Sequence, residues 1–99
     1  MNNYKSLTSS SPTVLVEFYA SWCGHCQRMM PVIDHVRGLI GDAVPIYQFD
    51  VDKESALAEE ESIDVTPTFI LYHHGNPVWR HTGEIDGNVL LQELQSYMN

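Results

Sequence analysis

VEFYASWCGHC, residues 16–26, joins an apolar run rich in β-branched and aromatic residues to the start of a helical pattern. It contains the only two cysteines of the chain, Cys23 and Cys26, three positions apart. A helix places positions i and i+3 on one face, close enough for a disulfide, and the unpaired N–H groups at its start stabilise a thiolate. The segment therefore predicts dithiol chemistry, and we expect Cys23, nearer the helix end, to be the more acidic thiol.

The first half of the chain predicts a strand, a helix and a second strand around this segment. The continuous apolar run at residues 13–19 predicts a central strand covered on both faces, and residues 23–40 predict a helix that Pro31 should kink. A strand at residues 44–51 and an acidic helix at residues 52–61 come next. Because strand, helix and strand alternate, we expect the two strands to pair in parallel.

The rest of the chain predicts an antiparallel hairpin and two further helices. Residues 68–72 and 77–81 flank the sequence His-His-Gly-Asn at 73–76, which is typical of a hairpin connection. Residues 86–98 have a helical period, and the polar segment 1–11 predicts a short first helix, with Tyr4 and Leu7 at helical spacing. The apolar positions of the predicted helices are Met29, Met30, Val32, Ile33, Val36, Leu39, Ile40, Ile85, Val89, Leu90, Leu91, Leu94 and Tyr97, and Ala56, Leu57 and Ala58 are expected to face inward.

Length, composition and charge limit the range of functions. With 99 residues and 43% hydrophobic content, the chain can build one core, so we expect a single domain over residues 1–99. A formal charge of −8 opposes nonspecific attraction to nucleic acid or anionic membrane. Residues 1–12 lack the pattern of an export signal, and no apolar run approaches membrane-spanning length. We therefore expect a cytoplasmic location, a monomer, and neither nucleic acid nor membrane as partner.

The cysteine pair has three chemical interpretations. Structural zinc usually needs four ligands, but the chain has no second cysteine pair, and His73 and His74 are adjacent on a predicted strand, which would turn their side chains to opposite faces. A structural disulfide across so short a loop would restrict the unfolded chain little. Redox activity is the interpretation we favour, with no metal, and the other two stay open.

Two further positions are unusual for their surroundings. Glu17 is a carboxylate in the middle of an apolar strand, where burial would raise its pKa, and it precedes the cysteines closely enough to exchange a proton with them. A strand face open to water is the alternative. Pro67 stands where a strand begins, as expected for a residue that cannot donate a sheet hydrogen bond. From the residues alone, an ordinary trans bond is the expectation for Thr66-Pro67.

Several of these motifs, in this order and spacing, resemble the thioredoxin superfamily over nearly the whole chain. Residues 16–26 are similar to the family's strand and active-site turn, Pro31 to its helix-kinking proline, residues 65–68 to its cis-proline loop, and Gly83 to the glycine that lets substrate approach. The resemblance implies an α/β fold, the thioredoxin-like three-layer sandwich. A mixed central sheet would be flanked by helices.

The resemblance also implies roles for individual residues. Cys23 would be the attacking thiol, Cys26 the resolving thiol, and Glu17 the buried acid that serves Cys26. The Thr66-Pro67 bond would be cis. An extended substrate segment would be held by strand-like hydrogen bonds on a shallow apolar surface formed by Trp22, Val65, Thr66, Pro67 and Gly83. The substrates would be protein disulfides and the electron donor a thioredoxin-reductase-type enzyme, with no cofactor beyond the redox-active disulfide Cys23–Cys26.

The chain departs from the family pattern in several places. The first family strand is missing or vestigial, so we expect about four strands, and Gln48 replaces a lysine often found near the buried acid. Gly24 and His25 between the cysteines are typical of protein disulfide isomerases. With Trp22 they are expected to tune the redox potential, because a partly charged imidazole stabilises the Cys23 thiolate and makes the disulfide a better oxidant. An arginine of the isomerases is absent, and Glu84 follows Gly83 instead.

We therefore expect a thiol–disulfide oxidoreductase that reduces protein disulfides. The alternatives are a disulfide oxidase or isomerase in an oxidising compartment, a peptide-binding module of the same fold whose cysteines are idle, and a redox sensor whose disulfide controls a partner.

Overall fold

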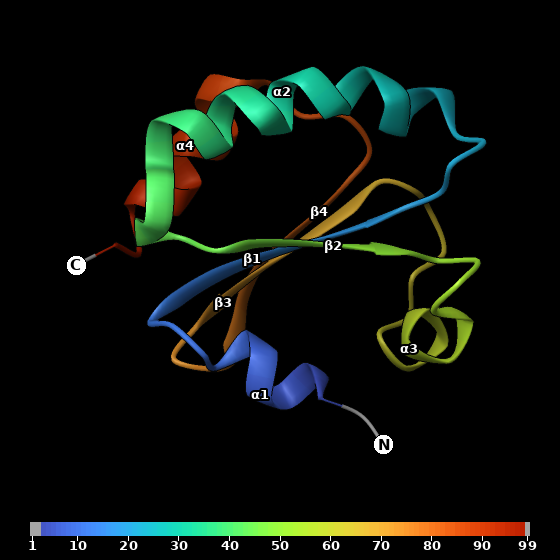
Figure 1. Cartoon of the computed structure of the whole chain (residues 1–99), viewed down its shortest axis with the longest axis horizontal. Helices are drawn as coiled ribbons and strands as arrows, with labels where there is room; N and C mark the ends of the chain where they lie inside the picture. Colours follow the sequence, from blue (N-terminus) through green and yellow to red (C-terminus); the bar gives the residue numbers. More distant parts are fainter. Residues whose placement is uncertain (1–2, 99) are drawn as a thin grey trace.

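The computed structural model describes residues 3–98 and contains one four-stranded sheet (Figure 1). Its strands are β1 (Thr13–Tyr19), β2 (Ile46–Asp50), β3 (Thr68–His73) and β4 (Asn76–Thr82), in the order β2-β1-β3-β4. β1 pairs with β2 in parallel and with β3 antiparallel, and β3 pairs with β4 antiparallel. The predicted mixed sheet, its parallel pair and its hairpin are confirmed.

Helices cover both faces of the sheet, as predicted. They are α1 (Tyr4–Thr8), α2 (Gly24–Ile40), the 3-10 turn η1 (Gly41–Ala43), α3 (Ser55–Glu60) and α4 (Gly87–Gln95). In Figure 1, α2 and α4 lie on one side of the sheet, and α1 and α3 lie on the other. The start of the predicted first helix, Met1 and Asn2, lies outside the described residues. The single domain of residues 1–99 extends beyond them at both ends and stays a prediction.

Strand β1 is buried on both faces because it lies between these two layers. Leu15 belongs to the core that α2 and α4 close, whereas Val14, Val16 and Phe18 belong to the core beneath α1 and α3. Side chains alternate between the faces of a strand, so Glu17 points to the same side as Leu15, toward α2. The strand therefore delivers a carboxylate to the layer that holds the cysteines.

Four of the apolar side chains of these helices are exposed, among them Ala56, which was expected to face inward. The buried residues of α2 are Cys26, Met29, Ile33, Val36 and Ile40, whose spacing of three or four residues forms one stripe. Met30 and Leu39 lie off that stripe and are each 59% exposed. For the same reason Val89 of α4 and Ala56 of α3 face solvent.

The expectation for His73 and His74 was also wrong. β3 ends at His73, and His74 adopts a φ of 51°, which takes it out of the strand. His74 and Gly75, with a φ of 81°, form the two-residue connection to β4, and both positive φ values suit a hairpin turn. The two imidazole rings consequently pack against each other, with centroids 4.3 Å apart.

Candidate active site

The two cysteines lie where β1 gives way to α2. Cys23 is the residue that caps the helix, with extended backbone, and its sulfur accepts a hydrogen bond from the backbone N–H of Cys26 at 3.3 Å. Both cysteines are free thiols and both are buried. The predicted helix start is confirmed, since α2 begins at Gly24.

The two thiols differ in acidity because their surroundings differ. Burial by itself raises the pKa of the Cys23 thiol, but hydrogen bonds from Cys26 and from the backbone N–H groups of Cys26 and His25 outweigh it and bring this pKa below its usual value. Burial, together with the hydrogen bond to Cys23, raises the pKa of the Cys26 thiol to about 11. Cys23 is therefore the more acidic of the two thiols, and Cys26 the less acidic.

Glu17 lies in the interior beneath the second cysteine. It is 2% exposed, and its Oε1 accepts a hydrogen bond from Nε2 of Gln48 at 2.8 Å. Gln48 stands opposite Glu17 in the parallel pair and accepts a long hydrogen bond from Arg37 at 3.4 Å. Burial raises the pKa of Glu17, and the hydrogen bond from Gln48 and the charge of Arg37 offset this only in part. The carboxyl group is desolvated, and the alternative of a strand face open to water is wrong.

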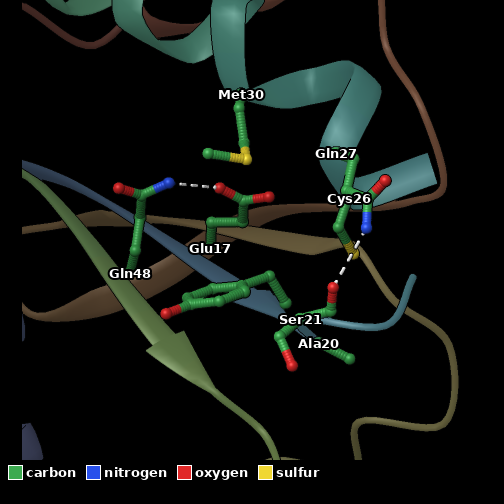
Figure 2. A pocket seen from close by; sticks show the side chains of 8 residues that line it. Glu17, Ala20, Ser21, Cys26, Gln27, Met30 and Gln48 are labelled. Carbon is green, nitrogen blue, oxygen red and sulfur yellow. Dashed lines mark hydrogen bonds between the residues drawn. The ribbon is translucent and has the colours of Figure 1, made fainter. Parts of the chain in front are cut away.

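A cavity of about 390 Å³ connects this carboxyl group with Cys26. Figure 2 shows Glu17 beside Gln48, with Met30 above it and Cys26 on the side away from Gln48. Tyr19, Ala20, Ser21 and Gln27 complete the lining. Water that enters this space can carry a proton between the carboxyl group and the Cys26 thiol.

The Thr66-Pro67 loop lies against the first cysteine. The Cys23 thiol donates to the carbonyl oxygen of Thr66 at 3.4 Å, and the Thr66-Pro67 bond is cis, so the trans expectation from the residues alone was wrong. Gly83, with a φ of 89°, donates its N–H to the carbonyl oxygen of Pro67 at 2.8 Å. These contacts link Cys23, Thr66, Pro67 and Gly83, which come from three distant parts of the chain.

Two large apolar side chains near these residues are exposed: Trp22 precedes Cys23 in the sequence, and Val65 precedes Thr66. Trp22 is 71% exposed and Val65 is 51% exposed. The indole N–H of Trp22 donates to Oδ2 of Asp52 at 2.9 Å, which fixes the ring although most of it faces solvent. The role of Trp22, Val65, Thr66, Pro67 and Gly83 in substrate binding stays a prediction.

Two charged contacts near the site were not predicted from the sequence. Nδ1 of His25 lies 2.6 Å from Oε2 of Glu84, and Nε of Arg28 donates to the same oxygen at 2.9 Å. The hydrogen bonds from His25 and then Arg28 hold the pKa of Glu84 below its usual value. The sequence analysis named Glu84 only as a departure from the isomerases, and it did not name Arg28 or Asp52 as site residues. Exposed charged residues such as these have no distinctive spacing that would mark a contact.

Residues 3–98 include no group of three or more His, Cys, Asp or Glu side chains that could hold a metal ion. Within the same range, no helix is long and apolar enough to cross a membrane.

The fold, with a Cys-x-x-Cys pair of unequal acidity at a helix start beside a cis-proline loop, defines the class of thioredoxin-like proteins. The family model for thioredoxin matches residues 1–98, and the chain belongs to the thioredoxin family.

Individual relatives agree with this assignment. Chloroplastic thioredoxin Y of Oryza sativa is 38% identical over 90 residues, which are 91% of this chain and 54% of that protein. A thioredoxin-like protein of Synechocystis is 36% identical over 97 residues, covering 97% of this chain and 92% of that protein. The chain thus spans about half the length of the rice relative. A solved mutant thioredoxin from Halobacterium salinarum superposes with a TM-score of 0.86 at 32% identity, covering 96% of this chain and 82% of that one.

Proposed function

We propose that this protein reduces disulfide bonds in other proteins, with Cys23 as the attacking thiol and Cys26 as the resolving thiol. The observation that carries the proposal is the opposite shift of the two thiol pKa values around one helix start. The thiolate is the reactive species in disulfide exchange, so the more acidic sulfur attacks.

The reaction has two exchange steps. The Cys23 thiolate attacks one sulfur of the substrate disulfide, forms a mixed disulfide, and releases the other substrate sulfur as a thiolate that takes up a proton. Cys26 then loses its proton and attacks the Cys23 sulfur, which releases the second substrate thiolate. The substrate gains two electrons and two protons, and the protein is left with the Cys23–Cys26 disulfide. A separate thioredoxin-reductase-type donor would restore the dithiol.

Glu17 is proposed as the group that receives the proton of Cys26. Three observations support this role: Glu17 is buried, its pKa is raised, and it lines the same cavity as Cys26. A carboxyl group of raised pKa is a better proton acceptor near neutral pH than an ordinary one. Because Gln48 is neutral, this acid has no lysine partner, and its proton affinity is set mainly by burial.

Substrate binding is proposed at the surface formed by Trp22, Val65, Thr66, Pro67 and Gly83. An extended peptide could add its backbone hydrogen bonds at Thr66, whose carbonyl oxygen already contacts Cys23. The exposed faces of Trp22 and Val65 would contribute the apolar area. Gly24, His25 and Trp22, which surround Cys23 in the sequence, are proposed to tune its potential.

The test is to trap the mixed disulfide. A Cys26→Ser variant keeps the attacking thiol but cannot resolve the intermediate, so it should accumulate a covalent complex with a disulfide-containing protein such as insulin. The complex should release both components on treatment with dithiothreitol. The matched Cys23→Ser variant should form none, and equal trapping by both variants would contradict the assigned roles.

A disulfide oxidase or isomerase is the second candidate, favoured by His25 between the cysteines. It would run the same exchange in the opposite direction, and the reduction potential of the pair distinguishes the two. If replacing both cysteines with serine left the biological activity intact, the peptide-binding alternative would hold instead.

We also propose that the protein works as a monomer in the cytoplasm. The sequence has two cysteines, both placed in the reactive site, and so offers no further pair for a structural disulfide, which suits a reducing compartment. Cell fractionation and size-exclusion chromatography test these two points separately. Recovery of the protein from an oxidising compartment would favour the oxidase or isomerase.

A further inference from the structure

His25, Arg28 and Glu84 form an exposed charged cluster beside the dithiol, here called the Glu84 cluster. Their side chains are 63%, 59% and 38% exposed. One carboxylate oxygen of Glu84 lies 2.6 Å from Nδ1 of His25 and 2.9 Å from Nε of Arg28. Arg28 also places a terminal nitrogen 2.8 Å from Nδ1 of His25. The three groups therefore share their contacts within one small site.

Two segments of the chain contribute the Glu84 cluster near Cys23. His25 is the residue between the cysteines, and the guanidinium of Arg28 lies over Gly24, 3.6 Å from where a Cβ atom on that glycine would be. Glu84 comes from a different segment, because it follows Gly83, whose N–H donates to the carbonyl oxygen of Pro67. Two basic side chains near the start of α2 thus meet a single carboxylate that comes from the loop after β4.

The contacts direct the imidazole of His25 into the cluster. A ring nitrogen can donate or accept a hydrogen bond but cannot do both, so Nδ1 of His25 donates to Glu84 or accepts from Arg28. In both arrangements, Nδ1 of His25 makes its hydrogen bond to another member of the cluster. Arg28 carries its charge at all working pH values, and Glu84 compensates that charge directly through the bond at 2.9 Å.

Charge near Cys23 determines which redox state of the protein is favoured. The reduced protein contains the Cys23 thiolate and the disulfide form does not, so a nearby positive charge stabilises the reduced form and makes the disulfide a stronger oxidant. A nearby negative charge has the opposite effect. We propose that Glu84 is a redox-determining residue, which neutralises Arg28 and His25 and so keeps the Cys23–Cys26 pair reducing although His25 stands between the cysteines.

This inference rests on the proposed function, because it assumes that Cys23 and Cys26 exchange electrons with other thiols. Glu84 touches neither sulfur in the contacts described, so it is a positioning residue that acts through His25 and Arg28. It also explains how a Cys-Gly-His-Cys site can belong to a reductant. The spacing of the cysteines alone gives no information about how these neighbouring groups shift the redox equilibrium.

The experiment measures the equilibrium of the full-length protein with reduced and oxidised glutathione at neutral pH and low salt. One disulfide plus two glutathione thiols give one dithiol plus one glutathione disulfide. A Glu84→Gln variant should raise this equilibrium constant roughly three- to tenfold, which is about 14–30 mV at 29.6 mV per tenfold. Glu84→Asp keeps the charge and should stay closer to the native protein than Glu84→Gln.

Two controls separate the charge effect from a structural one. Asp42→Asn removes an exposed carboxylate near the far end of α2, roughly 25 Å away by the helical rise, and should leave the constant unchanged. In 1 M salt, where the screening length falls to about 3 Å, the difference between Glu84→Gln and the native protein should shrink. A purely structural defect would not follow ionic strength in this way.

The outcomes distinguish this inference from the function on which it rests. If the native protein does not equilibrate with glutathione as a two-electron couple, the proposed function fails and this inference fails with it. If the native protein equilibrates and Glu84→Gln matches it, only the inference is wrong. A shift that persists unchanged in 1 M salt, or that Asp42→Asn reproduces, would also overturn it.

Discussion

Cys23 and Cys26 are three residues apart and differ in reactivity because only Cys23 has its sulfur at the end of a helix. Its sulfur receives backbone N–H groups that would otherwise lack a partner, and these stabilise the thiolate. Cys26 is one turn further into α2 and is 3% exposed, in contact with apolar neighbours. One short motif therefore produces two sulfurs of different acidity, which supports the proposed roles of Cys23 in attack and Cys26 in resolution.

Alkylation of the reduced protein should modify Cys23 first. Burial raises the pKa of the Cys26 thiol to about 11, so this thiol is protonated at pH 7, whereas Cys23 is more acidic than an ordinary thiol. Treatment with less than one equivalent of iodoacetamide, followed by peptide mass spectrometry, should find the label on Cys23. Equal labelling of the two cysteines, or labelling mainly on Cys26, would contradict the described surroundings.

Glu17 should reduce the unfolding free energy of the protein increasingly as the pH rises. Its pKa is higher in the folded protein than in the unfolded chain, so its contribution is fully present below the unfolded value and is lost as the pH rises through the folded value. Above that window the folded protein holds a buried carboxylate. A Glu17→Gln variant should match the native protein near pH 4 and exceed its unfolding free energy at pH 8, by roughly 1–3 kcal/mol.

Denaturant unfolding across this pH range measures the effect of Glu17. The matched control is Glu59→Gln, which removes an exposed carboxylate of α3 and should show no such pH-dependent gain. A Glu17→Gln variant that is destabilised at every pH would show that the carboxylate is better satisfied than its contacts indicate.

At the scale of elements, the apolar patterns located the strands and helices but not their ends. β1 and the start of α2 agree with the predictions, whereas β2 covers only residues 46–50 of the expected 44–51 and α3 only 55–60 of 52–61. Sequence patterns show where apolar side chains repeat, but an element ends where its hydrogen bonds find other partners. The backbone N–H of Lys53, for example, donates to the carbonyl oxygen of Asp50 in a turn before α3 begins.

The first turn of α4 depends on one capping side chain. Asp86 accepts hydrogen bonds from the backbone N–H groups of Asn88 at 3.0 Å and Val89 at 3.3 Å. An Asp86→Ala variant should lose about 1 kcal/mol of unfolding free energy, and Asp86→Asn should lose much less because asparagine is an equally good cap. Chemical denaturation compares the two, and equal losses would show that the cap contributes nothing.

At the scale of the whole molecule, the site is an assembly of segments that are distant in the sequence. Cys23 meets Thr66 across 43 positions, Glu17 meets Gln48 across 31, and His25 meets Glu84 across 59. The motif around the cysteines and the resemblance to a family predicted the first of these neighbourhoods. The resemblance also singled out Gln48 as the replacement for the lysine near Glu17, and the structure places it there.

The pairing of His25 with Glu84 could not be predicted in the same way. It joins two exposed polar residues from different elements, and neither hydrophobic periodicity nor turn chemistry specifies such a contact. The loop after β4 reaches the start of α2 only because α2 packs on the sheet that contains the β3–β4 hairpin. The proposed electrostatic tuning of the site by Glu84 therefore depends on the folded molecule.

The central claim is that this chain is a reductant, and the equilibrium reduction potential of the native Cys23–Cys26 pair against glutathione at neutral pH tests it most directly. We predict a value near about −270 mV, which is typical of thioredoxin. A value near about −180 mV, typical of protein disulfide isomerase, would contradict the claim and identify an oxidant or isomerase.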